Sequence, residues 1–181
     1  ELAAKHRERQ AATALAKRAN GLPLVIRSLA TMCRRQEASK VLSYLEGCAQ
    51  TSRAPQLALR PTVGYDYRDL FHALDATVRA LPEGDAPRLE MLTCFLSAPT
   101  PLQVLTHLWE YETQLEVVEV VTRLADWHLV EYDAKHRHVA LLDLHVDYLC
   151  TRPGVSERAR GWHAKLLRAA RCEDAYWNVA Q

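Results

Sequence analysis

The sequence predicts a mainly helical protein, in which a helical bundle is followed by three further helices and a β-hairpin. Three observations lead to this fold class. Apolar residues recur every three or four positions along most of the chain, and glycine or proline separates these stretches. One short region differs, because two runs that favour strands flank a polar turn. With 181 residues, the chain has room for one large domain or two small ones.

A glycine and a proline separate the first two helices. The first helix carries small and apolar residues on one face: Ala11, Leu15 and Ala19. Asn20 and Gly21 then form a pair that commonly ends helices, because both residue types tolerate a left-handed backbone. We expect Pro23 at the start of the second helix, where its fixed φ is favourable, and that helix continues to Cys33.

A long loop that contains prolines separates the third and fourth helices. The third helix is expected from Ala38 to Glu46 and is ended by Gly47, and the loop then continues to Gly64. Asp66 is expected to cap the fourth helix. That helix has an apolar stripe at nearly ideal helical spacing: Tyr67, Leu70, Phe71, Leu74, Val78 and Leu81.

The fifth helix is predicted to start at Asp85 with Pro87, to carry apolar residues as far as Leu96, and to end before Pro99.

Two capping-box patterns then predict two more helix starts. In this pattern the side chain at the third helical position reaches back to the capping residue. The pairs with this spacing are Thr100 with Gln103 and Thr113 with Glu116.

A β-hairpin and two helices complete the predicted elements. The strand-like runs are Leu129 to Tyr132 and Arg137 to Leu141, joined by the four-residue turn Asp133 to His136. Asp143 is expected to cap the following helix, and Ser156 to open the last one. Three helices followed by a hairpin is the order of a winged-helix domain. We therefore predict a helical domain at 1–84, a winged-helix domain at 85–153 and the start of a second helical domain at 154–181.

Composition excludes several functional classes. The formal net charge of +1 gives no overall field that would draw the chain to nucleic acid or to an anionic membrane. No window is long and apolar enough to span a bilayer, and the amino terminus has no signal-peptide core. The five cysteines are odd in number and widely spaced, as is typical of buried, reduced thiols in a cytoplasmic protein.

No catalytic motif is present, and we expect no catalytic residue, no metal and no enzyme activity in this chain. The sequence lacks a phosphate-binding GxxxxGK[ST] loop, a GxGxxG, an HExxH and paired zinc ligands. His136 and His138 are two positions apart and would share a face of the hairpin, but two histidines without a third ligand make a poor metal site. Cys150 and Cys172 have no obvious activating neighbour.

Charge also argues against DNA binding by the third helix of the predicted winged helix, the element that commonly enters the major groove. This helix and its lead-in carry four acidic residues, Glu110, Glu112, Glu116 and Glu119, against Arg123 alone. DNA phosphates would repel such a helix. A small basic patch, Lys135 to His138, lies at the tip of the hairpin and either contacts a phosphate or an acidic partner or is only a solvated turn.

Four segments resemble, in the same order, parts of one family. They are A-N-G-L-P-L at 19–24, G-Y-D-Y at 64–67 with the helix that follows, the stretch from 101 to 113, and L-L-D-L-H-V-D-Y-L at 141–149. The chain is similar here to the NB-ARC switch ATPases of the STAND class, of the apoptosome type. The resemblance runs from about Ala11 to Leu149, and more thinly through Trp162 and the Tyr176–Trp177 pair.

The resemblance implies a role in nucleotide switching. An upstream domain of the same protein would bind ADP or ATP, this chain would close over the nucleotide, and exchange would release the parent protein to form a homo-oligomer. Gly21, Leu22 and Pro23 match the family's GLPL motif, whose proline packs on the adenine. Asp143 matches the aspartate of the MHD motif, which caps the turn after the wing.

One position departs from the family pattern. Leu142 stands where the MHD motif has the histidine that contacts the phosphates of ADP, and leucine cannot donate a hydrogen bond. We therefore expect ADP locking to be weakened or to depend on another group, such as His145 or His138.

The leading interpretation is a regulatory, non-catalytic fragment of such a switch, in the cytoplasm, acting in cell death or immune signalling. We expect no tight binding of ADP or ATP by this chain alone, and no membrane or nucleic-acid partner. The alternative is a stand-alone winged-helix module that binds protein or DNA.

Overall fold

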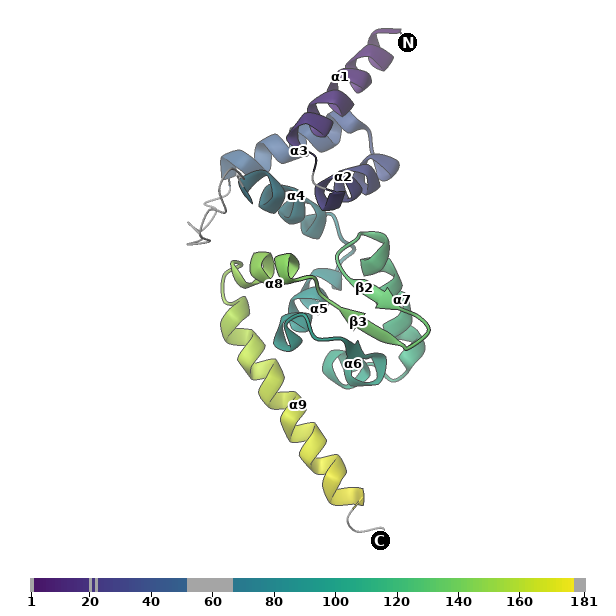
Figure 1. Cartoon of the computed structure of the whole chain (residues 1–181), viewed down its shortest axis with the longest axis vertical. Coiled ribbons are helices and arrows are strands. Elements are labelled where there is room, and N and C mark those ends of the chain that lie inside the picture. Colours follow the sequence, from purple (N-terminus) through teal and green to yellow (C-terminus); the bar gives the residue numbers. More distant parts are fainter. Residues whose placement is uncertain (1, 20, 22, 52–66, 178–181) are drawn as a thin grey trace. The chain divides into compact units, whose positions relative to one another are not determined.

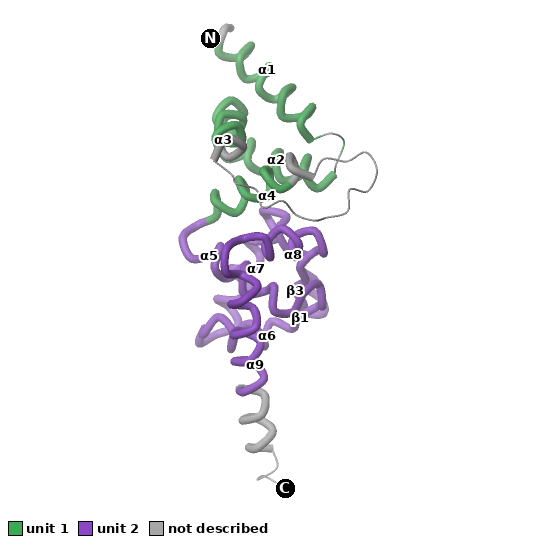
Figure 2. Tube along the Cα trace, turned by 90° about the vertical axis from the view of Figure 1, so that its left-hand side faces the viewer, with its two compact units in different colours: residues 1–81 green, residues 82–181 purple. Residues whose placement is uncertain are grey.

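The computed structural model describes residues 2–19, 21, 23–51 and 67–177, which are mainly helical. The chain forms two compact units, Glu1–Leu81 and Pro82–Gln181 (Figure 2). The three domains predicted from the sequence, 1–84, 85–153 and 154–181, stay a prediction, and α9 (Val155–Trp177) belongs to the second unit.

The described part of unit 1 forms the helices α1 (Leu2–Arg18), α2 (Pro23–Arg35), α3 (Ala38–Thr51) and α4 (Tyr67–Arg79). Helix α3 packs on α1 and on α4, and α2 packs on α4 (Figure 1). The core between these helices contains fully buried side chains, among them Met32, Val41 and Leu74. The Thr77 hydroxyl lies in this core and donates to the Ala73 carbonyl at 2.8 Å, so that its burial leaves no orphan donor.

The predicted start of the second helix is confirmed, and the predicted end of the third is wrong. Pro23 is the first residue of α2, and Gly21 before it has the left-handed backbone expected, with φ of 74°. Helix α3 continues through Gly47 to Thr51. A glycine inside a helix costs about 1 kcal/mol, which the packing of α3 on two neighbours offsets. The predicted loop and the Asp66 cap lie outside the described residues.

Unit 2 combines helices with a small antiparallel sheet. Its helices are α5 (Asp85–Met91), the 3-10 helix η1 (Leu92–Phe95), α6 (Leu102–Trp109), α7 (Gln114–Asp126), α8 (Asp143–Cys150) and α9. The strands are β1 (Thr100–Pro101), β2 (Glu131–Asp133) and β3 (His138–Ala140), in the order β1-β3-β2. Helix α9 packs on α5, η1, α6 and α8 (Figure 1).

The predicted hairpin is confirmed, with its turn moved by one residue. Asp133 pairs with His138, so the turn comprises residues 134–137. The sequence did not predict β1, in which Thr100 pairs with Val139 and Pro101 with His138. A strand of two residues that includes a proline has no alternation from which it could be recognised.

One of the two capping boxes is confirmed. The Thr113 hydroxyl accepts a hydrogen bond from the Glu116 backbone N–H, and the Glu116 carboxylate accepts from the Thr113 N–H at 3.0 Å. The box predicted at Thr100 is wrong, since Pro101 precedes α6 and no side chain caps it. Thr100 is held in β1, where its hydroxyl donates to the Ala98 carbonyl at 3.1 Å.

The fifth helix is shorter than predicted. Gly84, with φ of 86°, precedes it at the capping position, and the α-helical hydrogen bonding changes to a 3-10 turn at Leu92. Leu96 then ends that turn with φ of 56°, a conformation that costs a residue with a side chain some strain.

Candidate functional site

Four of the predicted site residues lie at two turns, Gly21 and Pro23 in unit 1 and Leu142 and Asp143 in unit 2, whereas His138 lies in β3 and His145 in α8. In unit 1, Gly21 and Pro23 are exposed at the turn from α1 to α2. Leu22 lies outside the described residues. The proline ring at the first position of α2 removes no hydrogen bond from the helix, because the first N–H groups of a helix have no partner within it.

In unit 2, the turn from β3 to α8 carries Leu142 and Asp143. Leu142 is half-buried and extended, with φ of −72° and ψ of 148°, and its carbonyl accepts from the backbone N–H groups of His145 at 2.8 Å and Val146 at 3.1 Å. Leu142, and not Asp143, therefore stands at the capping position. The expected Asp143 cap is wrong, since the exposed Asp143 is the first helical residue and no side-chain bond caps α8. The negative charge of Asp143 can still stabilise α8, because it lies beside the positive end of the helix dipole.

His145 is buried, which changes what it can do. His145 is only 1% exposed to solvent. Neither of its ring nitrogens has a hydrogen-bond partner in the described part of the chain. Burial lowers the pKa of His145 to about 4, so the ring is neutral near pH 7. A buried, neutral imidazole cannot contact a phosphate unless α8 moves.

His138 is more accessible than His145. It is half-buried in β3 and pairs with Asp133 of β2 and Pro101 of β1. His136 lies in the exposed turn, where its Nδ1 is 2.6 Å from the Asp133 carboxylate. That hydrogen bond lowers the pKa of Asp133. Over the described residues, no three His, Cys, Asp or Glu side chains come together as metal ligands.

The basic hairpin tip is a tightly bonded turn. The Asp133 carboxylate accepts from the backbone N–H groups of Lys135 at 2.9 Å and His136 at 3.0 Å. Arg137 has φ of 56° and donates from Nη2 to the Gln114 Oε1 at 2.6 Å, at the start of α7. Two of the four basic side chains are thus held by neighbours within unit 2.

A buried ion pair that sequence reasoning missed joins α5 to α7. Asp85 is fully buried, and its carboxylate accepts from Arg123 Nε at 2.9 Å and from Arg123 Nη2 at 3.0 Å. Arg88 adds a longer contact of 3.3 Å to the same carboxylate. The hydrogen bonds to Asp85 raise the pKa of Arg123. An aspartate at a helix start gave no signal of this partner, which is 38 residues away.

A second group of ion pairs holds α9 and Arg152, which precedes it, against the rest of unit 2. The Glu90 carboxylate of α5 binds Arg152 Nε at 2.9 Å and Arg158 Nη2 at 2.8 Å. Further along α9, Lys165 pairs with Glu110, and this pairing lowers the pKa of Glu110. Helix α9 is thus held by charges at two places along its length.

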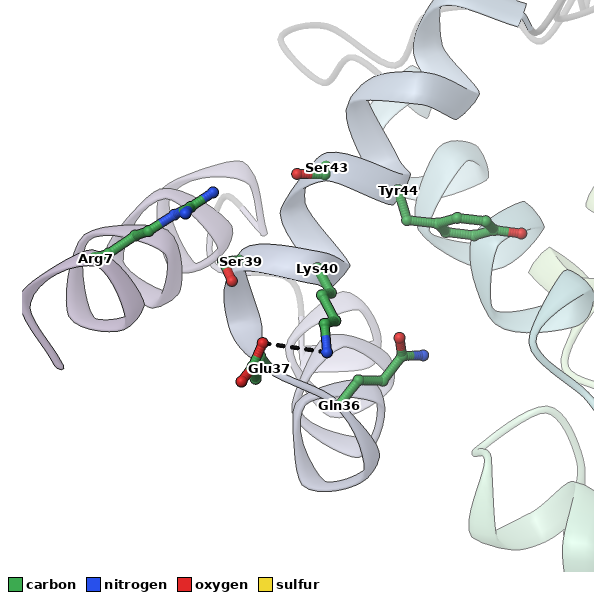
Figure 3. A pocket seen from close by; sticks show the side chains of 7 residues that line it. All are labelled: Arg7, Gln36, Glu37, Ser39, Lys40, Ser43 and Tyr44. Atoms are coloured by element: carbon green, nitrogen blue, oxygen red, sulfur yellow. Dashed lines mark ion pairs between the residues drawn. The ribbon is translucent and has the colours of Figure 1, made fainter. Parts of the chain in front are cut away.

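Unit 1 contains a pocket of about 590 Å³ that is lined by residues with polar or charged side chains. It is formed by Arg7, Gln36, Glu37, Ser39, Lys40, Ser43 and Tyr44 (Figure 3). Lys40 pairs with Glu37, three positions before it, at 3.3 Å, as the dashed line in Figure 3 shows. The Glu8 carboxylate of α1 binds the start of α3, where it accepts a hydrogen bond from the Ser39 N–H at 3.4 Å. Bonds from Ser39 lower the pKa of Glu8. The Lys40 ammonium and the Ser39 N–H are therefore each already bound by a carboxylate of unit 1.

The cysteines whose side chains are described are free thiols. Cys33 and Cys94 are half-buried free thiols, and burial raises the pKa of both, to about 11 for Cys94. Cys150 is a free thiol that is exposed, so the expectation of burial is wrong for it. The side chains of Cys48 and Cys172 are not among those that the structure describes.

We compared the chain with protein-family models and with curated protein sequences. No protein-family model and no curated protein sequence matches the chain. Among the described residues, none of the helices has both the length and the apolar character needed to cross a bilayer.

Proposed function

We propose that residues 85–153, within unit 2, form a winged-helix domain. The order of its elements supports this, because α5, β1, α6 and α7 precede the β2–β3 hairpin and the sheet order is β1-β3-β2. In such a domain, α7 would be the third helix and the β2–β3 hairpin the wing.

We further propose that the chain is the regulatory, non-catalytic part of an NB-ARC-type nucleotide switch. The observation that carries this proposal is the order of two turns along the chain. A left-handed Gly21 leads into a helix that starts at the exposed Pro23, and later a wing-like hairpin runs through Leu142 into a helix that starts with Asp143. That is the order in which the GLPL-like and MHD-like segments were expected.

The nucleotide, ADP or ATP, would be bound mainly by an upstream domain of the same cytoplasmic protein. The Pro23 ring is exposed and has no N–H, so it offers an apolar surface on which an adenine would stack. Closure over ADP would hold the inactive state, and release would permit the parent protein to assemble with itself in cell death or immune signalling.

Leu142 makes the ADP lock weaker in this proposal. Its side chain has no donor, and its carbonyl is used by the first turn of α8. Of the two histidines expected to replace the motif histidine, His145 is buried with a neutral ring, so the half-buried His138 is the better candidate.

Calorimetry with ADP tests the division of labour. The chain alone should show no tight binding, whereas a longer protein that includes the upstream nucleotide-binding domain should bind. Tight binding by this chain alone would contradict the proposal. So would the absence, in the upstream sequence, of a strand followed by a GxxxxGK[ST] loop and a helix.

The time for which ADP stays bound to the longer protein tests the role of Leu142. Leu142→His should lengthen it, because the imidazole can donate to a phosphate. Leu144→His is the matched control, since Leu144 is also half-buried at the start of α8. An unchanged dwell time in Leu142→His shows that the leucine does not weaken the lock.

DNA binding is disfavoured by charge. Arg123 is the basic residue of α7, and its guanidinium is already bound by Asp85. A gel shift with duplex DNA should therefore show no salt-dependent complex.

A further inference from the structure

Tyr111 lies in the short connection between α6 and α7, where the chain is neither helix nor strand. The other tyrosines whose side chains the structure describes are in regular elements: Tyr44 in α3, Tyr132 in β2 and Tyr148 in α8. An enzyme that modifies a side chain needs the backbone around it to enter its own cleft, and a helix or a paired strand meets this need only by local unfolding. Of these four tyrosines, Tyr111 therefore has the backbone best suited to modification.

The ring of Tyr111 is held by two neighbours. Its centroid lies 6.4 Å from that of Trp109, with the two ring planes at 84°, and the Arg88 Cζ lies 5.0 Å from it. The Tyr111 backbone N–H donates to the Thr106 carbonyl at 3.0 Å. In the described part of the chain, the Tyr111 hydroxyl is neither hydrogen-bonded nor buried. The phenol oxygen is therefore available for reaction, although the ring itself is fixed.

The Arg88 guanidinium can be shared with a negative group on this oxygen. Arg88 Nη1 is 3.3 Å from the Asp85 carboxylate, which also accepts two shorter bonds from Arg123, at 2.9 and 3.0 Å. Asp85 therefore keeps its main partner when Arg88 turns away. Arg123, whose pKa is raised chiefly by Asp85, also interacts electrostatically with Tyr111. A phosphate on the Tyr111 hydroxyl would thus have one arginine that can turn to bind it and a second that favours its charge.

Carboxylates flank Tyr111 in the sequence. Glu110 and Glu112 are its neighbours, and both are exposed. Glu110 pairs with Lys165, whereas Glu112 forms no ion pair in the described part of the chain. Acidic flanks favour an enzyme with a basic substrate groove, and they repel a phosphate, so that its retention depends on the arginines. Tyr132 also lies between two acidic residues, but it is paired in the sheet with β3. The two tyrosines thus offer similar flanking charge and differ in their backbone.

We propose that Tyr111 is a phosphorylation site for a tyrosine kinase with a basic substrate groove, and that Arg88 holds the phosphate after transfer. In the transfer, the Tyr111 oxygen attacks the γ-phosphorus of ATP, and an O–P bond forms as the bond from that phosphorus to the bridging oxygen breaks. ADP leaves, and the phenol proton passes to a base of the kinase. The phosphate brings a charge of about −1.5 to −2 beside Arg88 and Arg123.

Phosphorylation of the full chain tests the site. The chain is incubated with ATP and a tyrosine kinase of broad specificity, and the modified residues are mapped by mass spectrometry. Tyr111 should be phosphorylated at least about fivefold faster than Tyr132, because freeing a paired strand costs a local opening. Peptides of residues 106–116 and 127–137 are the matched controls, and they should react at similar rates, because they have similar flanking charge and no fold.

Two results would overturn the site. One is the absence of phosphate on Tyr111 of the full chain. The other is a ratio of Tyr111 to Tyr132 phosphorylation that is the same in the full chain as in the two peptides, since the fold would then play no part.

Titration of the phosphorylated chain by ³¹P NMR tests the role of Arg88, with the Tyr111 signal assigned by its absence in Tyr111→Phe. The pKa of the second phosphate ionisation should be lower in the wild type than in Arg88→Gln, because a neighbouring guanidinium favours the dianion. Arg160→Gln is the matched control, since Arg160 is exposed on α9, and it should titrate as the wild type does. Circular dichroism checks folding, and Arg88→Met replaces Arg88→Gln if that variant is unfolded. Equal titration in the wild type and the Arg88 variant would show that Arg88 does not hold the phosphate.

Discussion

Acidification should destabilise unit 2 through His145. The imidazole is buried without a hydrogen-bond partner in the described residues, and burial lowers its pKa from 6.5 to about 4. In the unfolded chain the ring regains water and its ordinary pKa. Between these two pKa values the unfolded state binds more protons than the folded state, so folding stability falls as the pH falls.

The size of the effect follows from the two pKa values. The gap between 6.5 and about 4 corresponds to about 3 kcal/mol of unfolding free energy, as an order of magnitude. This stability is fully present above pH 6.5, is reduced by about 2 kcal/mol at pH 5, and is lost once the pH has fallen below about 4. Urea denaturation can be measured over this whole range of pH.

Urea denaturation at several pH values measures the effect. The wild type should lose about 2 kcal/mol of unfolding free energy between pH 7 and pH 5 that His145→Leu does not lose. Leucine suits the site because it has no polar atom to bury. His107→Leu is the control, since His107 is exposed, and it should keep the wild-type pH dependence. If His145→Leu has the same pH dependence as the wild type, the reasoning from burial is refuted.

Three further substitutions test the contacts that organise unit 2. Arg123→Ala should cost about 3 kcal/mol in urea denaturation, because it leaves the Asp85 carboxylate buried without its main partner; the value is at the low end because the arginine side chain is 42% exposed. Thr113→Ala should cost about 1 kcal/mol in thermal denaturation through loss of the capping box. Glu90→Gln should speed hydrogen exchange in the first turns of α9, since it weakens both arginine contacts, and high salt should do the same to the wild type.

Each of these has a result that contradicts it. A loss below about 0.5 kcal/mol for Arg123→Ala would mean that Arg88 or water satisfies the carboxylate. No change for Thr113→Ala would show that the start of α7 is fixed by tertiary packing alone. Unchanged exchange in Glu90→Gln would show that apolar contacts hold α9 by themselves.

Local chemistry is what the sequence could predict. Gly21 and Pro23 set the turn before α2, because a left-handed backbone and a fixed φ are properties of those residues alone. The capping box at Thr113 needs a partner only three positions away. The hairpin was predicted for the same reason, apart from a shift of one residue at its turn.

The errors occurred where distant parts of the chain compete with local preference. Thr100 has the spacing of a capping box, but pairing with Val139 holds it in a strand. Gly47 has the chemistry of a helix end, but packing on α1 and α4 continues α3 past it. In each case tertiary contacts offset a local preference of about 1 kcal/mol.

The sequence by itself determined the mainly helical class, most of the helix starts and the hairpin. It also determined the acidic character of α7, since these properties depend on residue type and on spacing within a few positions. Only the tertiary structure decided that Asp85 holds Arg123, that His145 is buried, and that Leu115 is left exposed. The burial of a side chain and its distant partners depend on how the helices pack against one another, and no local spacing encodes that arrangement.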